Sequence, residues 1–127
     1  METFYINTVV LTSCLVSIIY GEKNLGSYGT PSHFPIYKTD RYLPQRALDP
    51  PKSSYFEYSG GGTCSHSADW PNTTFGYWRI EFPEEVYITT VELYYRVGFA
   101  RRMDGITLSI TNDPDRLSTD DICFKDK

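Results

Sequence analysis

The sequence predicts an all-β domain of the sandwich type, and three observations support this fold class. Segments in the second half of the chain alternate between apolar and polar residues, which is the period of a strand with one buried face. Gly and Pro punctuate the first half densely, and both residues break helices and favour turns. No segment after residue 21 shows the period of a helix longer than one or two turns. Short strands joined by turns are typical of two packed sheets.

The bulk composition bounds the size and class of the domain. The 127 residues give room for a single domain, and 40% apolar with 16% aromatic residues are enough for a packed core. The formal net charge of −4 argues against a nucleic-acid surface, which needs a basic face. We therefore expect partners other than nucleic acid.

The first 21 residues differ from the rest of the chain. Glu2 is their only charged residue, and the apolar run from Val9 to Tyr20 is shorter than the ~20 residues that a spanning helix needs. We expect a signal peptide over residues 1–21, a secreted domain over residues 22–127, and no membrane insertion after cleavage. An uncleaved anchor and a buried N-terminal strand are the alternatives.

The region from Glu22 to Gly62 has no sustained period of either kind. Short extended pieces are expected around His33 to Tyr37. Such a long irregular region inside a compact domain is usually functional or wraps a sheet.

The first clear strand is predicted over residues 77–82, and Pro83 ends it. Strict alternation places Trp78, Ile80 and Phe82 on one face, which we expect to be buried. The other face carries the polar side chains of this strand, Tyr77, Arg79 and Glu81.

Two further strands are expected, over residues 86–97 and 105–111. The inward residues of the longer strand change phase near its start, which predicts a bulge at Thr89-Thr90. The last strand alternates between an inward set, Ile106, Leu108 and Ile110, and an outward set, Thr107 and Ser109.

Cysteine usage and a glycosylation sequon agree with export. Cys14 would leave with the signal peptide, so Cys64 and Cys123 would remain. In an oxidising compartment these two permit one intramolecular disulfide, which would stabilise the fold by roughly 3–5 kcal/mol. Asn72 begins an Asn-Thr-Thr sequon in a polar stretch and is a candidate glycosylation site.

Residue patterns that would support catalysis are sparse. Ser65-His66 has no nucleophile-elbow pattern around it, and the glycine run at 60–62 lacks the Lys that a phosphate loop needs. Glu84 and Glu85 are adjacent, so on a strand their side chains would point apart. We expect a protein that is not an enzyme.

A more specific set combines His66 with Arg96, Arg101 and Arg102. In a sandwich the loops gather at the ends of the strands, so a loop His and the Arg residues of another loop can meet. Arg offers a fork of donors that suits adjacent sugar hydroxyls, and a neutral His adds a donor or an acceptor.

An apolar wall would complete such a site, and Phe99 or Tyr95 could supply it against the C–H face of a sugar. The alternative is a solvated Arg101-Arg102 loop with His66 as a satisfied turn residue. Residue types alone favour that alternative.

Several motifs in order along the chain resemble the fucolectins, a branch of the discoidin-like lectins. The family has an Asn-Leu-Ala start, an Ala-(Val/Ile)-Asp loop, a Cys-(Thr/Ser)-His step and a Trp-Trp-Arg-Val-Asp-Leu strand. The matching pieces here are residues 24–25 (Asn-Leu), 46–49 (Arg-Ala-Leu-Asp), 63–66 (Thr-Cys-Ser-His), 77–82 (Tyr-Trp-Arg-Ile-Glu-Phe), 87–91 (Tyr-Ile-Thr-Thr-Val) and 102–110. The ending Ile-Cys-Phe-Lys-Asp at 122–126 is similar to the domain found in multidomain surface proteins of molluscs.

The resemblance implies a jelly-roll-like β-sandwich, of the galactose-binding-domain kind, that binds fucose-type sugars through one His and two Arg. His66 matches the sugar-binding His and Arg102 the second Arg, whereas Arg96 falls one residue from the first. Residues 97–100 replace an Asp and a pair of adjacent Cys in the family.

The resemblance also implies a structural calcium ion, the only cofactor we expect. Asp49 matches a calcium ligand, and Thr63 and Cys64 fall where main-chain oxygens contribute. Arg46 and Pro51 stand where the family has Asn ligands.

In the family, the partners of both cysteines lie further along the chain. The resemblance therefore implies that the domain lacks its C-terminal strands, and that Cys64 and Cys123 are unpaired or intermolecular. We expect a secreted, lectin-like domain for fucose-type glycans on cell surfaces or microbes. The alternative is a discoidin-like adhesion module that binds other extracellular proteins without sugar.

Overall fold

The computed structural model describes residues 3–8, 12–20, 23–37, 42–48, 64–67, 76–113, 115 and 118–127. Half of these residues are in strands, and the helices among them are 3-10 helices of three or four residues. The described part holds no α-helix, which confirms the all-β fold class. In chain order the elements are β1 Thr3–Thr8, β2 Thr12–Tyr20, β3 Lys23–Asn24, η1 Gly26–Tyr28, β4 Thr30–Phe34, η2 Pro44–Ala47, β5 Ser65–His66, β6 Gly76–Glu81, β7 Thr90–Tyr95, η3 Ala100–Met103, β8 Thr107–Thr111, η4 Thr119–Asp121 and β9 Ile122–Lys125.

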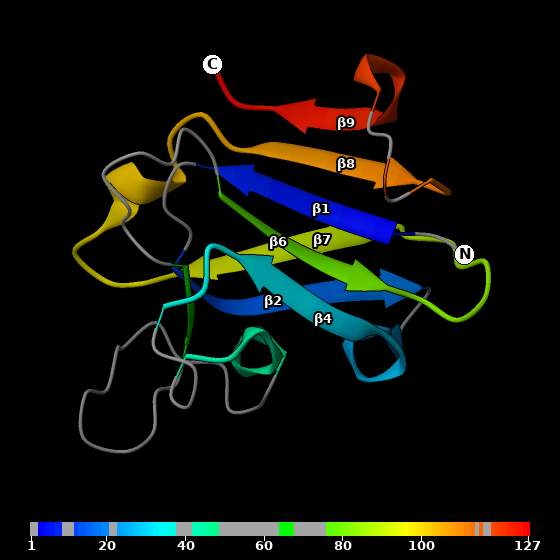
Figure 1. Cartoon of the computed structure of the whole chain (residues 1–127), viewed down its shortest axis with the longest axis horizontal. Helices are drawn as coiled ribbons and strands as arrows, with labels where there is room; N and C mark the ends of the chain where they lie inside the picture. Colours follow the sequence, from blue (N-terminus) through cyan, green and yellow to red (C-terminus); the bar gives the residue numbers. More distant parts are fainter. Residues whose placement is uncertain are drawn as a thin grey trace.

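The strands form two antiparallel sheets (Figure 1). The larger sheet has the order β4-β6-β1-β8-β9. In the smaller sheet β2 pairs with β3, β5 and β7. Chain-distant segments therefore lie side by side, because β1 runs between β6 and β8.

One core joins the two sheets. Trp78, Ile80 and Phe82 are fully buried, as the alternation of residues 77–82 predicted. Val91 and Leu93 of β7 pack against this cluster, so side chains from both sheets meet in it. The Trp78 indole N–H is satisfied by the Pro44 carbonyl at 3.0 Å, which fastens η2 to the core.

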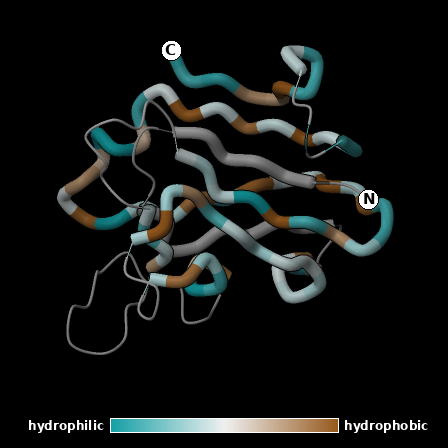
Figure 2. The backbone as a smooth tube through the Cα atoms, viewed as in Figure 1, coloured by the Kyte–Doolittle hydropathy of each residue, from teal (hydrophilic) through white to brown (hydrophobic). Residues whose placement is uncertain are grey.

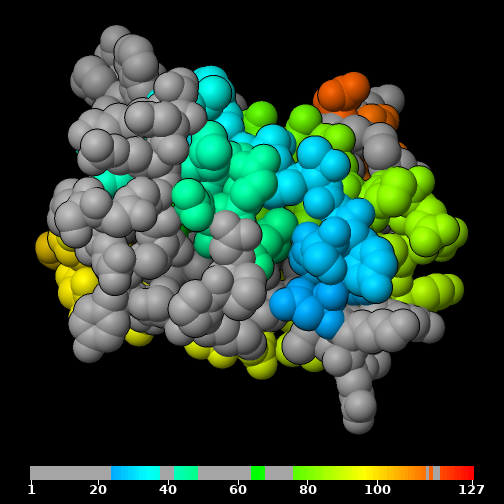
Figure 3. Space-filling view, turned by 90° about the horizontal axis from the view of Figure 1, so that it is seen from below, coloured from blue at the N-terminus to red at the C-terminus, as the bar shows by residue number. Residues whose placement is uncertain are grey.

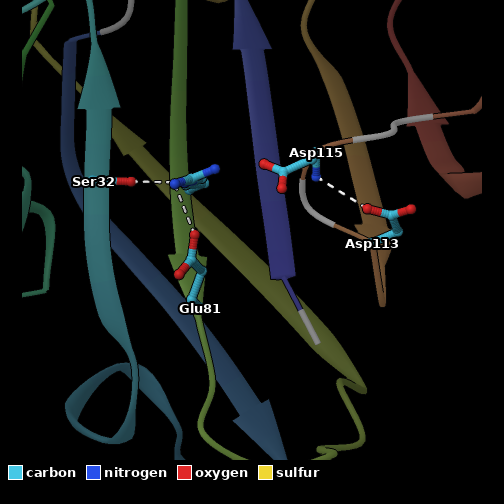
Figure 4. Close-up of polar contacts among 5 residues, drawn as sticks. Ser32, Glu81, Asp113 and Asp115 are labelled. Carbon is cyan, nitrogen blue, oxygen red and sulfur yellow. Dashed lines mark hydrogen bonds and ion pairs between the residues drawn. The ribbon is translucent and has the colours of Figure 1, made fainter. Parts of the chain in front are cut away.

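The opposite face of β6 is polar, as expected. Arg79 donates to the Ser32 hydroxyl of β4 at 2.9 Å and pairs with the Glu81 carboxylate at 2.8 Å. Figure 4 shows these two contacts running across and along the sheet, and beside them the Asp115 amide on the Asp113 carboxylate. The Arg79 contacts lie outside the core and tie β4 to β6.

The second predicted strand is shorter than expected. It begins at Thr90 rather than at residue 86, and no bulge occurs at Thr89-Thr90, so that prediction is wrong. The register shift of this strand pair lies near its other end, opposite Ser13 and Leu15. Val86 and Ile88 still pack against the core from the connection between β6 and β7. Because these two loop residues are apolar, the inward residues of the predicted strand changed phase, and the sequence was interpreted as a bulge.

The third predicted strand begins at Thr107, and hydrophobic and hydrophilic residues alternate along it (Figure 2). Leu108 and Ile110 pack against the core as predicted. Ser109 was expected to face outward, but it is only 2% exposed. It lies between β1 and β9, where neighbouring strands cover a small side chain from both sides.

The N-terminal segment contributes two strands. β1 lies in the middle of the larger sheet, and β2 carries the pairings of the smaller one. The structure thus shows the strand alternative for residues 3–8 and 12–20, while cleavage after Gly21 stays a prediction. Among the described residues, no helix is long and apolar enough to cross a membrane.

Candidate functional site

The sheet register brings the predicted His and the predicted Arg loop together. The backbone of Ser13 in β2 pairs with Ser65 of β5 and also with Tyr95 of β7. His66 therefore lies near the point where β7 ends and the 96–106 loop begins. These segments meet at the left end of the molecule in Figure 1.

The turns of this loop fix the direction of its side chains. The Phe99 amide donates to the Arg96 carbonyl at 3.1 Å, and the Arg102 amide donates to the Phe99 carbonyl at 3.0 Å. Residues three apart in such turns lie above one another. Gly98, with φ of +82°, supplies the left-handed backbone that the first turn needs.

Phe99 holds the two guanidinium groups. The Cζ atom of Arg96 lies 4.0 Å from the centre of the Phe99 ring, and that of Arg102 lies 4.6 Å from it. Both distances are within the range of a cation–π contact. The Phe99 ring thus contacts both cations of the site, and its expected role as a wall for the ligand stays a prediction.

His66 is linked to this loop through Arg102. Its Nδ1 lies 2.6 Å from the Ser67 carbonyl, and its Nε2 lies 3.3 Å from Nη1 of Arg102. A carbonyl only accepts, so Nδ1 must carry the proton, and Nε2 then accepts from Arg102. The contacts are those of a neutral imidazole with a fixed tautomer.

Two tyrosines that sequence reasoning missed support His66. The ring of Tyr37 lies 4.7 Å from the imidazole centre, and that of Tyr42 lies 5.9 Å from it. Tyr42 is only 2% exposed, and its carbonyl accepts from the His66 amide at 3.3 Å. Both lie in the region without a sequence period, where the density of Tyr was the only available signal.

A second histidine lies beneath the site. The Nδ1 of His33, on β4, is 2.8 Å from the Ser65 hydroxyl, and both residues are buried. Burial, and to a lesser extent repulsion by a charged His66, lowers the pKa of His33 to about 4. His33 is therefore neutral at neutral pH. The hydroxyl considered as a nucleophile beside His66 is bonded to His33 instead.

The Arg loop borders open space. Gly98, Phe99, Arg101 and Arg102 line a depression of about 430 Å³. That volume is in the range of small-molecule sites. Arg102 lies between this depression and His66, so a ligand seated there would meet its guanidinium first.

Three predicted site residues thus come together, since Phe99 joins Arg96 to Arg102 and Arg102 contacts His66. The predicted calcium ligands Asp49 and Thr63, and the predicted glycosylation site Asn72, lie outside the described residues. Within the described ranges, no group of three or more His, Cys, Asp or Glu side chains could hold a metal ion.

The predicted bridge between Cys64 and Cys123 is wrong. Cys64 is fully buried and disulfide-bonded, whereas Cys123 is a free thiol on the exposed strand β9. The Cys123 thiol bonds the Leu108 carbonyl at 3.3 Å, which orients it toward β8. The sequence holds two cysteines after residue 21, and their number alone suggested that they pair.

Comparisons of the chain with protein-family models, with curated proteins and with solved structures found no match.

Proposed function

We propose that this protein is an extracellular carbohydrate-binding domain, similar to the fucolectins, with a jelly-roll-like β-sandwich fold. Its ligands would be fucose-type glycans on cell surfaces or microbes. The observation that carries the proposal is the contact between His66 and Arg102, with Arg96 in contact with the same Phe99 ring as Arg102. The core formed between two antiparallel sheets is consistent with a sandwich.

The chemistry of the cluster suits a polyol. A guanidinium has five N–H donors, and His66 accepts at most one of those of Arg102. The planar guanidinium of an arginine can bind two adjacent sugar hydroxyls in a fork. Nε2 of His66 has a single lone pair, so a sugar hydroxyl could donate to it only in place of Arg102.

The support around the cluster favours binding with little rearrangement. Tyr37 and Tyr42 hold the imidazole, and Phe99 holds both guanidinium groups. A site whose side chains are already placed avoids part of the entropy cost of binding.

Retention on a fucose resin tests the proposal. Arg102→Lys keeps the charge but loses the fork, so we expect at least tenfold weaker binding, and Arg102→Ala should abolish retention. Arg79→Ala is the matched control, because Arg79 lies on the polar face of β6 away from the cluster. Thermal unfolding of each variant shows that the chain remains folded.

A folded wild-type chain that fails to bind any glycan would favour the adhesion module instead. Repeating the binding with EDTA tests the calcium expectation. Loss of retention with EDTA, restored by calcium and removed by Asp49→Ala, would support a calcium ion at that position.

A further inference from the structure

A cavity lies at the end of the molecule opposite to the His66 cluster. It has a volume of about 350 Å³ and is formed by Leu25 and Tyr28, at the two ends of the 3-10 helix η1, and by the connection between β6 and β7. Figure 3 shows the blue atoms of the segment after Lys23 beside the lime-green atoms of that connection. The lining residues are Leu25, Tyr28, Phe82, Pro83, Glu84, Glu85, Val86 and Tyr87.

The floor and the rim of this cavity differ in chemistry. Leu25 and Phe82 are core residues, 8% and 0% exposed, so the floor is apolar. Tyr28 and Tyr87 are 60% and 71% exposed, which is unusual for two large rings bordering the same hollow. A ligand here would meet hydrocarbon below and aromatic rings at the opening.

The rim is also negatively charged. Glu84 and Glu85 are exposed, and neither forms an ion pair with any residue that the structure describes. Glu81, only three residues before Glu84, is by contrast paired with Arg79. No lining residue is cationic, so the charge of the cavity is not compensated from within it.

We propose that this cavity binds an aliphatic cation, of the kind carried by lysine and arginine side chains. Such a group has a hydrocarbon stem that covers apolar surface and a charged head that stays near water. The stem would lie over Leu25 and Phe82. The head would lie among Tyr28, Tyr87 and the two carboxylates, where ring faces and negative charge both attract a cation. The inference is independent of the proposed sugar binding.

A neutral ligand fits this cavity less well. An apolar group would leave both carboxylates without a partner, and a sugar would offer them hydroxyl donors but no charge to compensate their own. The open rim suits a side chain that enters from a partner polypeptide, and it also admits a small free amine.

The test is titration of the full 15N-labelled chain by NMR with the peptide acetyl-Gly-Arg-Gly-amide. The matched neutral probe is the same peptide with citrulline, which has the shape of arginine without its charge. We expect shift changes confined to residues 25–28 and 82–87, and at least fivefold weaker binding of the citrulline peptide. Agmatine, a free guanidinium compound, distinguishes a small-molecule ligand from a peptide side chain.

Two substitutions make the test specific. Glu84→Gln and Glu85→Gln should together weaken the arginine peptide at least fivefold. Asp104→Asn, which removes one exposed carboxylate at the other end of the molecule, should leave it unchanged. Equal binding of both peptides, shift changes elsewhere, or an unchanged double variant would overturn the proposal.

Discussion

The two ends of the molecule are built in opposite ways. At the His66 end, polar side chains are buried and bonded to one another: Ser65 is 2% exposed, Tyr42 is 2% exposed, and His33 bonds Ser65. At the cavity end, Tyr28 and Tyr87 are 60% and 71% exposed. One end is organised around its own buried polar groups, whereas the other presents two large rings to solvent. Stability should therefore depend on the buried polar groups of the first end and hardly on the exposed rings of the second.

Two Tyr→Ala substitutions test this difference most strongly. Tyr42→Ala removes a buried ring that contacts both Tyr37 and His66, and we expect it to lower the free energy of unfolding by roughly 3 kcal/mol. Tyr87→Ala removes an exposed ring and should cost less than about 1 kcal/mol. Urea unfolding of the two variants measures both values. Equal costs would mean that the two ends do not differ in this way.

Lowering the pH should destabilise the His66 end in particular, because the buried His33 lies there. Its pKa in the folded state, about 4, lies below the ordinary value of 6.5, so between these values the unfolded chain binds more protons. The contribution is present in full above pH 6.5 and is lost as the pH falls toward 4. At 1.36 kcal/mol per pKa unit, the loss is up to about 3 kcal/mol.

Urea unfolding at a series of pH values between 7 and 4 measures this dependence. His33→Asn places an amide near the position of Nδ1 and keeps a partner for Ser65 without a titrating group. The variant should lose most of the slope below pH 6.5. A slope that persists in it would assign the acid sensitivity to His66 or to the carboxylates.

Sequence patterns predicted the strands where one face is buried and alternation is strict. Residues 77–82 are the clearest example, because Trp78, Ile80 and Phe82 reach the core of both sheets. Sequence patterns did not predict the segments whose buried residues follow no regular spacing. Val86 and Ile88 lie in a loop and are partly buried against the core, and the strand β9 carries mostly exposed residues that show no alternation.

The sequence predicted the polar residues of the candidate site, but it did not predict the aromatic residues that hold His66 in place. His66, Arg96 and Arg102 are distinctive residue types, and the three-residue spacing of Arg96, Phe99 and Arg102 fits the turns that align them. Tyr42 reaches His66 across a distance in sequence that only the fold closes. No local pattern encodes such a contact.

The next prediction separates the two rings that the sequence offered as a ligand wall. Phe99→Leu keeps an apolar side chain but removes both cation–π contacts, so we expect about tenfold weaker fucose retention with little change in stability. Tyr95 is 45% exposed and precedes the loop, and Tyr95→Ala should weaken retention less. Retention on the resin, with unfolding as the control, decides between them. A stronger effect of Tyr95→Ala would mean that the sugar stacks on Tyr95 and that Phe99 has no special role.

The smallest expected effect is that of a substitution at the cavity on the stability of the chain and on the His66 cluster at the other end. Glu85→Gln changes an exposed carboxylate that has no ion pair in the described part of the chain, so its effect on unfolding should stay within about 0.5 kcal/mol. Combined with Arg102→Lys, it should add nothing to the loss of fucose retention, because the two residues share no partner. A measurable coupling in that double-mutant cycle would show that β7, which runs from one end to the other, transmits strain between them. Additive effects would instead mean that the core between the two ends keeps the His66 cluster and the cavity energetically independent of each other.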